Sequence, residues 1–115
     1  MITPELKNLS SLDLERPALP PDPEDCIVFL EASIGPKGER GAELFYFNVV
    51  TPKGLLRWEL PRWGRGILFV DAFSWSLVER AVERLLSHAH CESWAEVAVV
   101  LNQEVNWEFE NYKPY

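Results

Sequence analysis

The sequence predicts an α+β fold in which helices pack on one face of a mostly antiparallel sheet. In the first half of the chain, two segments separated by a glycine-rich stretch alternate in character, and in the second half apolar residues recur every three or four positions. Period two is typical of strands, and the longer spacing is typical of amphipathic helices. The 115 residues, of which 47% are apolar, suffice for one hydrophobic core, so we expect residues 1–115 to form a single domain.

The two alternating segments predict a hairpin around which the rest of the sheet is organised. Side chains alternate strictly between the two faces from Cys26 to Ile34, and the segment from Leu44 to Val50 is rich in aromatic and β-branched residues. Between them, residues 35–41 contain three glycines and a proline, which allow the chain to reverse tightly. We therefore expect an antiparallel pair of strands.

The chain before this hairpin contains a weaker strand pattern and a connector. A mild alternation over residues 3–9 predicts a short edge strand. Residues 10–25 contain four prolines, which exclude a helix and disfavour a strand. We expect this Pro-rich acidic connector to lie extended over the surface, and not to link two domains, because nothing before it is large enough to fold alone.

Immediately after the hairpin, the sequence predicts a short helix and a loop. Thr51 and Pro52 form a helix start signal, and Pro61 supplies the stop. The side chains that we expect to face the sheet are Leu55, Leu56 and Trp58. A basic, glycine-rich loop from Arg62 to Gly66 follows.

The second half of the chain predicts a strand, two helices and a final strand. The nearly continuous apolar run from Ile67 to Phe73 favours a strand in a central position. A helix with a buried apolar stripe is expected over residues 74–87, and a second one, started by a Ser-x-x-Glu capping box, over residues 93–102. Residues 106–112 alternate again and predict a short strand.

The net charge of −7 is concentrated at the two ends of the chain. Residues 1–26 carry a charge of −4, residues 27–91 carry +1 and residues 92–115 carry −4. Such a surface repels nucleic acid, whose binding needs clustered Lys and Arg, and attracts a basic protein partner. The alternative is that the acidic ends only keep the protein soluble. No apolar run approaches the roughly 20 residues that span a bilayer, so we expect no membrane partner. Because no secretory signal is visible, we expect a cytoplasmic protein.

The cluster of His88, His90 and Cys91 is the one that suggests enzyme chemistry. Its spacing matches no zinc-binding pattern, and His88 is explained more simply as the end of a helix. A catalytic cysteine would need a histidine held against it by the fold. We predict no catalysis, metal or cofactor, and free thiols at Cys26 and Cys91. A small enzyme that uses this cluster is the alternative.

Four separated motifs keep a recognisable order and spacing. They are Ile34-Gly35-Pro36-Lys37-Gly38-Glu39, Val50-Thr51-Pro52-Lys53, Trp94-Ala95-Glu96-Val97-Ala98 and Trp107-Glu108-Phe109-Glu110-Asn111-Tyr112. Together they resemble the immunity protein 8 family of bacterial polymorphic toxin systems, over roughly residues 6–112. The resemblance implies a small α+β protein that binds a toxin from the same locus and protects the producing cell and its kin. The segment from Arg62 to Gly66 departs from the family pattern, and no set of binding residues is transferred.

Two groups of acidic residues and one tryptophan are the candidate partner contacts. The acidic residues are Asp22, Glu24 and Asp25 before the hairpin, and Glu104, Glu108 and Glu110 near the C-terminus. Trp63, in the basic loop, is either an interface anchor or a core residue, whereas Trp107 is expected in the core beside Phe109. We hypothesise that one acidic edge docks on the basic cleft of a cognate toxin, such as a nuclease. A generic structural or interaction subunit is a further alternative, and homodimerisation is left open.

Overall fold

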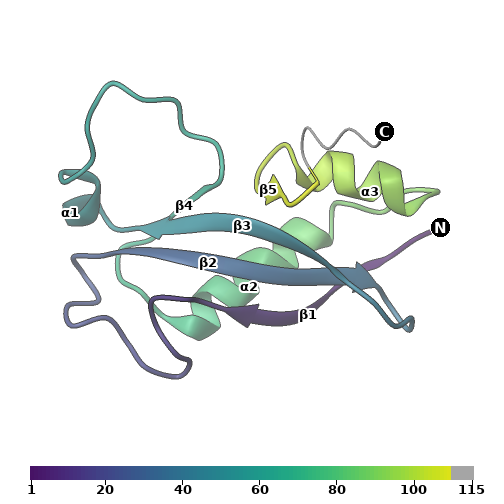
Figure 1. Ribbon diagram of the computed structural model, residues 1–115, viewed down its shortest axis with the longest axis horizontal. Coiled ribbons are helices and arrows are strands. Elements are labelled where there is room, and N and C mark those ends of the chain that lie inside the picture. The colour runs from purple at the N-terminus through teal and green to yellow at the C-terminus, as the bar shows by residue number, and fades with distance from the viewer. Residues whose placement is uncertain (110–115) are drawn as a thin grey trace.

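The computed structural model describes residues 1–109, which form one five-stranded sheet and three helices (Figure 1). The elements are β1 (Pro4–Ser10), β2 (Ile27–Pro36), β3 (Glu43–Val50), α1 (Pro52–Leu55), β4 (Ile67–Phe69), α2 (Trp75–Leu86), α3 (Trp94–Leu101) and β5 (Asn106–Trp107). The strand order is β1-β2-β3-β4, and β5 also pairs with β3. Among these strands only β3 and β4 pair in parallel. The predicted α+β fold with a mostly antiparallel sheet is confirmed.

The predicted hairpin forms the centre of the sheet because its two strands bury alternate side chains. β2 and β3 pair from Ile27 with Val50 to Ile34 with Glu43. The buried side chains that point to the core face are Val28, Leu30, Ala32, Ile34, Phe45, Phe47 and Val49. At the end of β2, a Cβ atom on Gly35 would lie 2.2 Å from the carbonyl oxygen of Gly41, so only glycine fits where the two strands meet.

Helices α2 and α3 supply the other side of the core. Figure 1 shows α2 crossing behind β2 and β3. The buried residues of α2 recur at helical spacing and are Trp75, Val78, Val82 and Leu86, and α3 adds Val97, Ala98 and Leu101. Both helices begin at the predicted serines, since Ser74 and Ser93 each accept a backbone hydrogen bond from the first turn. Among the helices of residues 1–109, none is long and apolar enough to cross a membrane.

The prediction of a central strand from Ile67 to Phe73 is wrong in both length and position. β4 contains only the first three of these residues and lies at the edge of the sheet. The edge of β3 that it joins is divided, because β4 pairs with the segment from Asn48 to Val50 while β5 pairs with Phe45 and Tyr46. Because β4 runs parallel to β3 and Phe69 already pairs with Val50, the last residue of β3, the apolar run has no further strand to pair with, and its remainder leads into α2.

The helix after the hairpin is shorter than predicted. α1 ends at Leu55, and its buried residues are Thr51 at the cap and Gly54. A Cβ atom on Gly54 would lie 2.2 Å from the carbonyl oxygen of Cys26, so the helix backbone packs directly on the start of β2. The backbone of Gly54 therefore makes the contact with the sheet, and Leu56, about 200° further around the helix, is exposed, contrary to the prediction.

The predicted C-terminal strand is present only in part. Within the described residues it covers Asn106–Trp107. Trp107 packs against the core, as predicted, and its ring lies 5.7 Å from that of Phe109. The remainder of the predicted strand, residues 110–112, lies outside the described residues.

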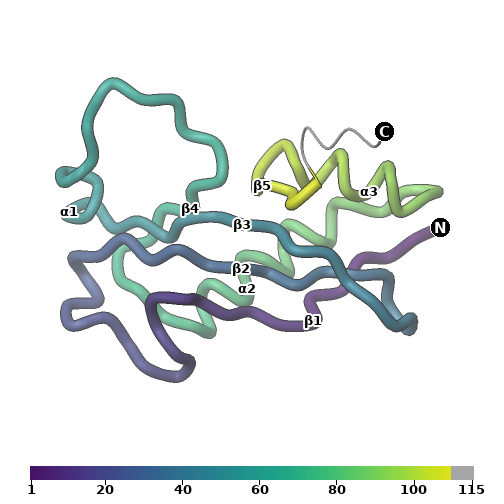
Figure 2. The backbone as a smooth tube through the Cα atoms, viewed as in Figure 1, coloured from purple at the N-terminus to yellow at the C-terminus, as the bar shows by residue number. Residues whose placement is uncertain are grey.

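Residues 11–26 form neither helix nor strand and run around the end of the sheet next to α1 (Figure 2). Polar contacts tie this connector to α2. The indole N–H of Trp75 donates to the carbonyl oxygen of Ala18 at 2.7 Å. Arg16 forms an ion pair with Glu79 at 2.7 Å. The connector therefore covers the beginning of α2 and belongs to the same packed unit as the sheet.

Candidate partner-binding surface

The N-terminal acidic group, Asp22, Glu24 and Asp25, lies beside α1. Two of its three carboxylates interact with other groups of the chain. Asp25 forms an ion pair with Arg57. The Oδ1 atom of Asp22 accepts a hydrogen bond from the backbone N–H of Glu24 at 3.0 Å. The Glu24 side chain is exposed. The Arg57 charge therefore offsets that of Asp25.

The C-terminal acidic group lies where β5 joins β3. Glu104 and Glu108 are both exposed. The carboxylate of Glu108 accepts a hydrogen bond from the backbone N–H of Leu44, and its own N–H donates to the Leu44 carbonyl at 3.0 Å. Glu110 lies outside the described residues. Glu108 is therefore held against the edge of the sheet in a defined position.

An aromatic pair next to Glu108 was missed by the sequence analysis. The rings of Phe29 and Tyr46 stack with their centres 5.7 Å apart. Glu31 lies directly across from Tyr46 in the pairing of β2 with β3. Burial, then the charge of Glu108 and then that of Glu31, raises the pKa of Tyr46 above its ordinary value. We call these four residues, Phe29, Glu31, Tyr46 and Glu108, the acidic sheet face.

The acidic sheet face lies on the side of the sheet that α2 and α3 do not cover. Core residues of β2 and β3 occupy the alternate positions of the same strands. Alternation along each strand places Phe29 and Glu31 on the face opposite the core, and it does the same for Tyr46. Only the register of the two strands shows that these side chains are neighbours.

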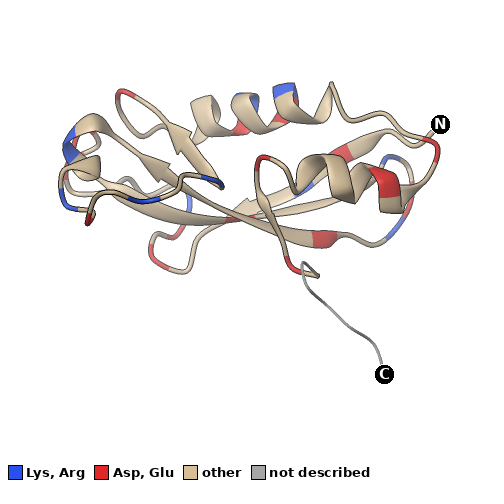
Figure 3. Ribbon diagram, turned by 90° about the horizontal axis from the view of Figure 1, so that it is seen from above, with Lys and Arg blue, Asp and Glu red and all other residues tan. Residues whose placement is uncertain are grey.

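Residues 56–66, here called the Trp63 loop, form a wide loop between α1 and β4 that rises away from the sheet (Figure 1). Its large apolar side chains are turned to solvent, since the exposed fraction is 81% for Leu56, 59% for Leu60 and 99% for Trp63. Trp63 therefore contributes nothing to the core. Basic positions also lie along this loop (Figure 3), which contains three arginines and one glutamate.

Side-chain contacts hold the Trp63 loop along its length. Arg57 is anchored near its start by the ion pair with Asp25. In the middle, the guanidinium carbon of Arg62 lies 4.1 Å from the centre of the Trp58 ring, which is a cation–π contact. At its end, two nitrogen atoms of Arg65 donate to the side-chain oxygen of Asn106, at 2.8 and 3.2 Å. The loop is therefore tied both to the connector and to β5.

His88, His90 and Cys91 follow α2, where they join the end of this helix to the start of the chain. Both histidine side chains are exposed, and Nδ1 of His90 lies 3.4 Å from the Thr3 hydroxyl. The backbone carbonyl of Cys91 accepts a hydrogen bond from the N–H of Ile2 at 2.7 Å, and its thiol is free. Within residues 1–109, no three His, Cys, Asp or Glu side chains are grouped so that they could hold a metal ion.

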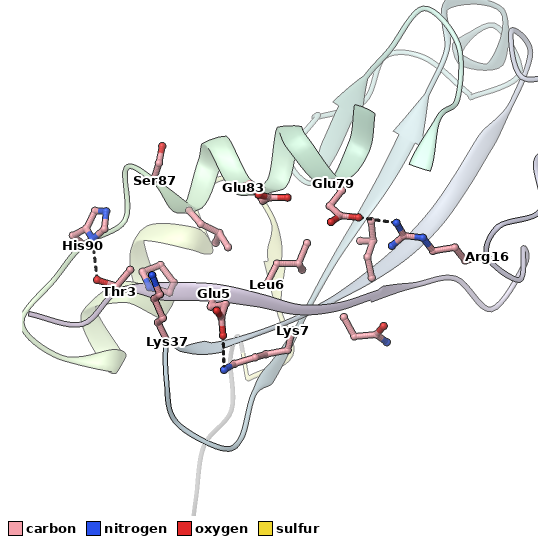
Figure 4. A pocket seen from close by; sticks show the side chains of 14 residues that line it. Thr3, Glu5, Leu6, Lys7, Arg16, Lys37, Glu79, Glu83, Ser87 and His90 are labelled. Carbon is pink, nitrogen blue, oxygen red and sulfur yellow. Dashed lines mark hydrogen bonds and ion pairs between the residues drawn. The ribbon is translucent and has the colours of Figure 1, made fainter. Parts of the chain in front are cut away.

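A groove of about 590 Å³ lies between β1 and α2 (Figure 4). Charged side chains of both signs line it, and several are paired within it. Lys7 contacts Glu5 at 2.8 Å and Arg16 contacts Glu79 at 2.7 Å. The hydrogen bond from Lys7 and its charge lower the pKa of the Glu5 carboxyl below its ordinary value. The groove therefore favours neither an anionic nor a cationic ligand.

One family model matches nearly the whole chain. It is that of immunity protein 8, and the match extends over residues 5–112. No curated protein and no solved structure matches. The matched range includes every helix and strand described above except the first residue of β1. The chain therefore belongs to the immunity protein 8 family.

Proposed function

We propose that this protein is a non-catalytic immunity protein that binds a cognate toxin domain tightly and neutralises it. Membership of the immunity protein 8 family over residues 5–112 is the observation that carries the proposal. The family implies a toxin partner. A small protein with an open sheet face and a protruding loop is able to inhibit such a partner by surface complementarity alone. On this proposal the binding takes place in the cytoplasm of the producing cell.

The acidic sheet face supports a basic partner. Glu31 lies on the β2 side of Tyr46 and Glu108 on the β5 side, and tyrosine is enriched at protein interfaces. The net charge of −7 adds a long-range attraction that speeds the capture of a basic protein. A toxin that cleaves nucleic acid needs a basic cleft for its substrate. We therefore propose that the acidic sheet face, together with Glu104 and Glu110, docks on such a cleft.

Toxicity rescue tests the function directly. The C-terminal toxin domain encoded immediately upstream is expressed with and without this protein, and the affinity of the purified pair is then measured. We expect rescue and a dissociation constant in the nanomolar range or below. Absence of both rescue and binding would refute the proposed function, and the fold and the family would be unaffected.

Matched charge reversals test the acidic sheet face. The double variant Glu31→Lys/Glu108→Lys is compared with Asp13→Lys/Glu15→Lys, which makes the same change in net charge on the exposed connector. We expect the first pair to raise Kd by about tenfold or more at low salt and the second by less than about threefold. Equal effects would show that only net charge matters, and the acidic sheet face would lose its role.

A further inference from the structure

The fold makes almost no use of Trp63. Its side chain is 99% exposed, whereas that of Trp75 is only 6% exposed. Leu56 and Leu60, which lie in the same loop, are also exposed. Several large apolar side chains in contact with water on one segment mark an interaction site, because burying them against a partner is favourable. Tryptophan is also prominent among the residues that carry most of the binding energy of an interface.

The Trp63 loop is ordered before any partner arrives. The N–H of Gly66 donates to the carbonyl of Glu104 at 2.9 Å, and the carbonyl of Gly66 accepts from the N–H of Asn48 at 2.9 Å. Gly66 makes this junction with a φ of 73°, a left-handed conformation that favours glycine. The contact of Arg62 with Trp58 braces the residue next to Trp63. A loop that is already braced loses less conformational entropy when it binds.

The loop differs in charge from the rest of the protein. Residues 56–66 contain three arginines and one glutamate in a chain whose net charge is −7. Arg57 is paired with Asp25, while Arg62 is exposed next to Trp63. A surface complementary to this loop has an apolar pocket with carboxylates at its border. The basic cleft that fits the acidic sheet face would repel it, so the loop requires a second contact area.

The loop adjoins the acidic sheet face. Arg65 hydrogen bonds to Asn106, and Asn106 lies across from Tyr46 in the pairing of β5 with β3. We infer that Trp63 inserts into an apolar pocket of the toxin whose border carries carboxylates, beside the basic cleft. This inference rests on the proposed function, because the occupant is the same toxin. Opposite charges on adjoining parts of one surface determine the orientation in which the partner docks.

Truncation of Trp63 tests the anchor. Because the side chain is exposed, Trp63→Ala should leave the thermal unfolding curve unchanged. We expect it to raise Kd for the toxin by about 30-fold or more, as at other dominant interface residues. The matched control Leu12→Ala truncates another exposed apolar side chain, on the connector, and should change Kd by less than about twofold.

The two proposals fail in different ways. If the wild-type protein binds the toxin and Trp63→Ala binds equally well, the inference is wrong and the proposed function stands. If the wild-type protein does not bind, the proposed function fails and the inference fails with it. A self-association seen in sedimentation that Trp63→Ala abolishes, with toxin affinity unchanged, would assign the loop to a contact between two copies of this chain and overturn the inference.

Charge reversal at Arg62 tests the chemistry of the pocket border. With carboxylates at that border, Arg62→Glu should slow association at low salt by about threefold to tenfold. The control Arg40→Glu makes the same charge change in the hairpin turn and should have a smaller effect. Faster association of Arg62→Glu than of the control would mean that the loop faces a basic surface, and the inference would be wrong.

Discussion

Replacement of Thr51 by valine removes a hydroxyl group that joins three parts of the fold. The Thr51 side chain is fully buried. Its Oγ1 atom accepts hydrogen bonds from the N–H of Cys26 at 3.0 Å and from the N–H of Gly54 at 3.2 Å, and it donates to the carbonyl of Cys26 at 3.3 Å. One hydroxyl therefore links the end of the connector, the end of β3 and the start of α1.

The expected loss of stability follows from these contacts. Valine has nearly the same shape as threonine, so Thr51→Val opens no cavity. A buried N–H left without a partner, here that of Cys26, costs about 1–3 kcal/mol. Loss of the N-cap hydrogen bond to Gly54 costs about 1 kcal/mol more. We therefore expect the free energy of unfolding to fall by about 3 kcal/mol, a large share of the roughly 5–15 kcal/mol typical of a domain.

Urea unfolding measures this loss. The midpoint should fall while the slope m stays constant, because the surface exposed on unfolding does not change. Thr51→Ser is the matched control, since it keeps the hydroxyl and removes one methyl group, and it should cost at most about 1.5 kcal/mol. A cost below about 1 kcal/mol for Thr51→Val, or an equal cost for both variants, would refute the assignment of stability to the hydroxyl.

Three further predictions concern packing, the histidine–cysteine cluster and pH. Gly54→Ala should lower the free energy of unfolding by about 2 kcal/mol or more in urea, because its Cβ would lie 2.2 Å from a backbone oxygen. Replacing His88, His90 and Cys91 together by alanine should leave toxin rescue intact in the co-expression assay. The raised pKa of Tyr46 means that the folded protein resists ionisation of this side chain. The contribution of Tyr46 to stability should be complete below about pH 10, which is the pKa of tyrosine in the unfolded chain, and it should be lost as pH rises through the pKa in the folded protein. An absorbance titration of the wild-type protein, compared with that of Tyr46→Phe, detects the ionisation of this side chain.

Gly64→Ala is the control for Gly54, because its Cβ would meet only a side-chain atom of Ile67 at 3.3 Å, and equal losses would refute the packing argument. Loss of rescue by the triple alanine variant, with unfolding unchanged, would favour the enzyme alternative. A Tyr46 that ionises at or below its ordinary pKa would show that Glu31 and Glu108 do not act on it.

Local patterns were sufficient to identify most helices and strands. The alternation in β2 and β3, the apolar stripe of α2 and the capping box of α3 each depend on residues within a few positions of one another. The resemblance to the immunity protein 8 family was likewise present in short motifs, and the family match bears it out. Exposure of Trp63 was consistent with its position between Pro61 and Gly64, although the pattern alone left a core position open.

The lengths of β4 and α1 depended on contacts between distant segments. The apolar run after Gly66 looked like a central strand, but it pairs in parallel with the last three residues of β3, and β3 ends at Val50, just before α1 begins. Leu56 looked like a core residue, but Gly54 packs its backbone against Cys26 instead. In both cases the residues themselves are compatible with the prediction, and the distant segment that they pair with or pack on decided the result.

The candidate binding surface was predictable in its composition and not in its geometry. Acidic residues and Trp63 were visible in the sequence. Only the register of β2 with β3 brings Glu31 beside Tyr46, and only the β3–β5 pairing adds Glu108. Periodicity assigns each side chain to a face of its own strand, since that depends on backbone geometry alone. Which faces become neighbours depends on hydrogen bonds between segments far apart in the chain, and therefore on the tertiary structure.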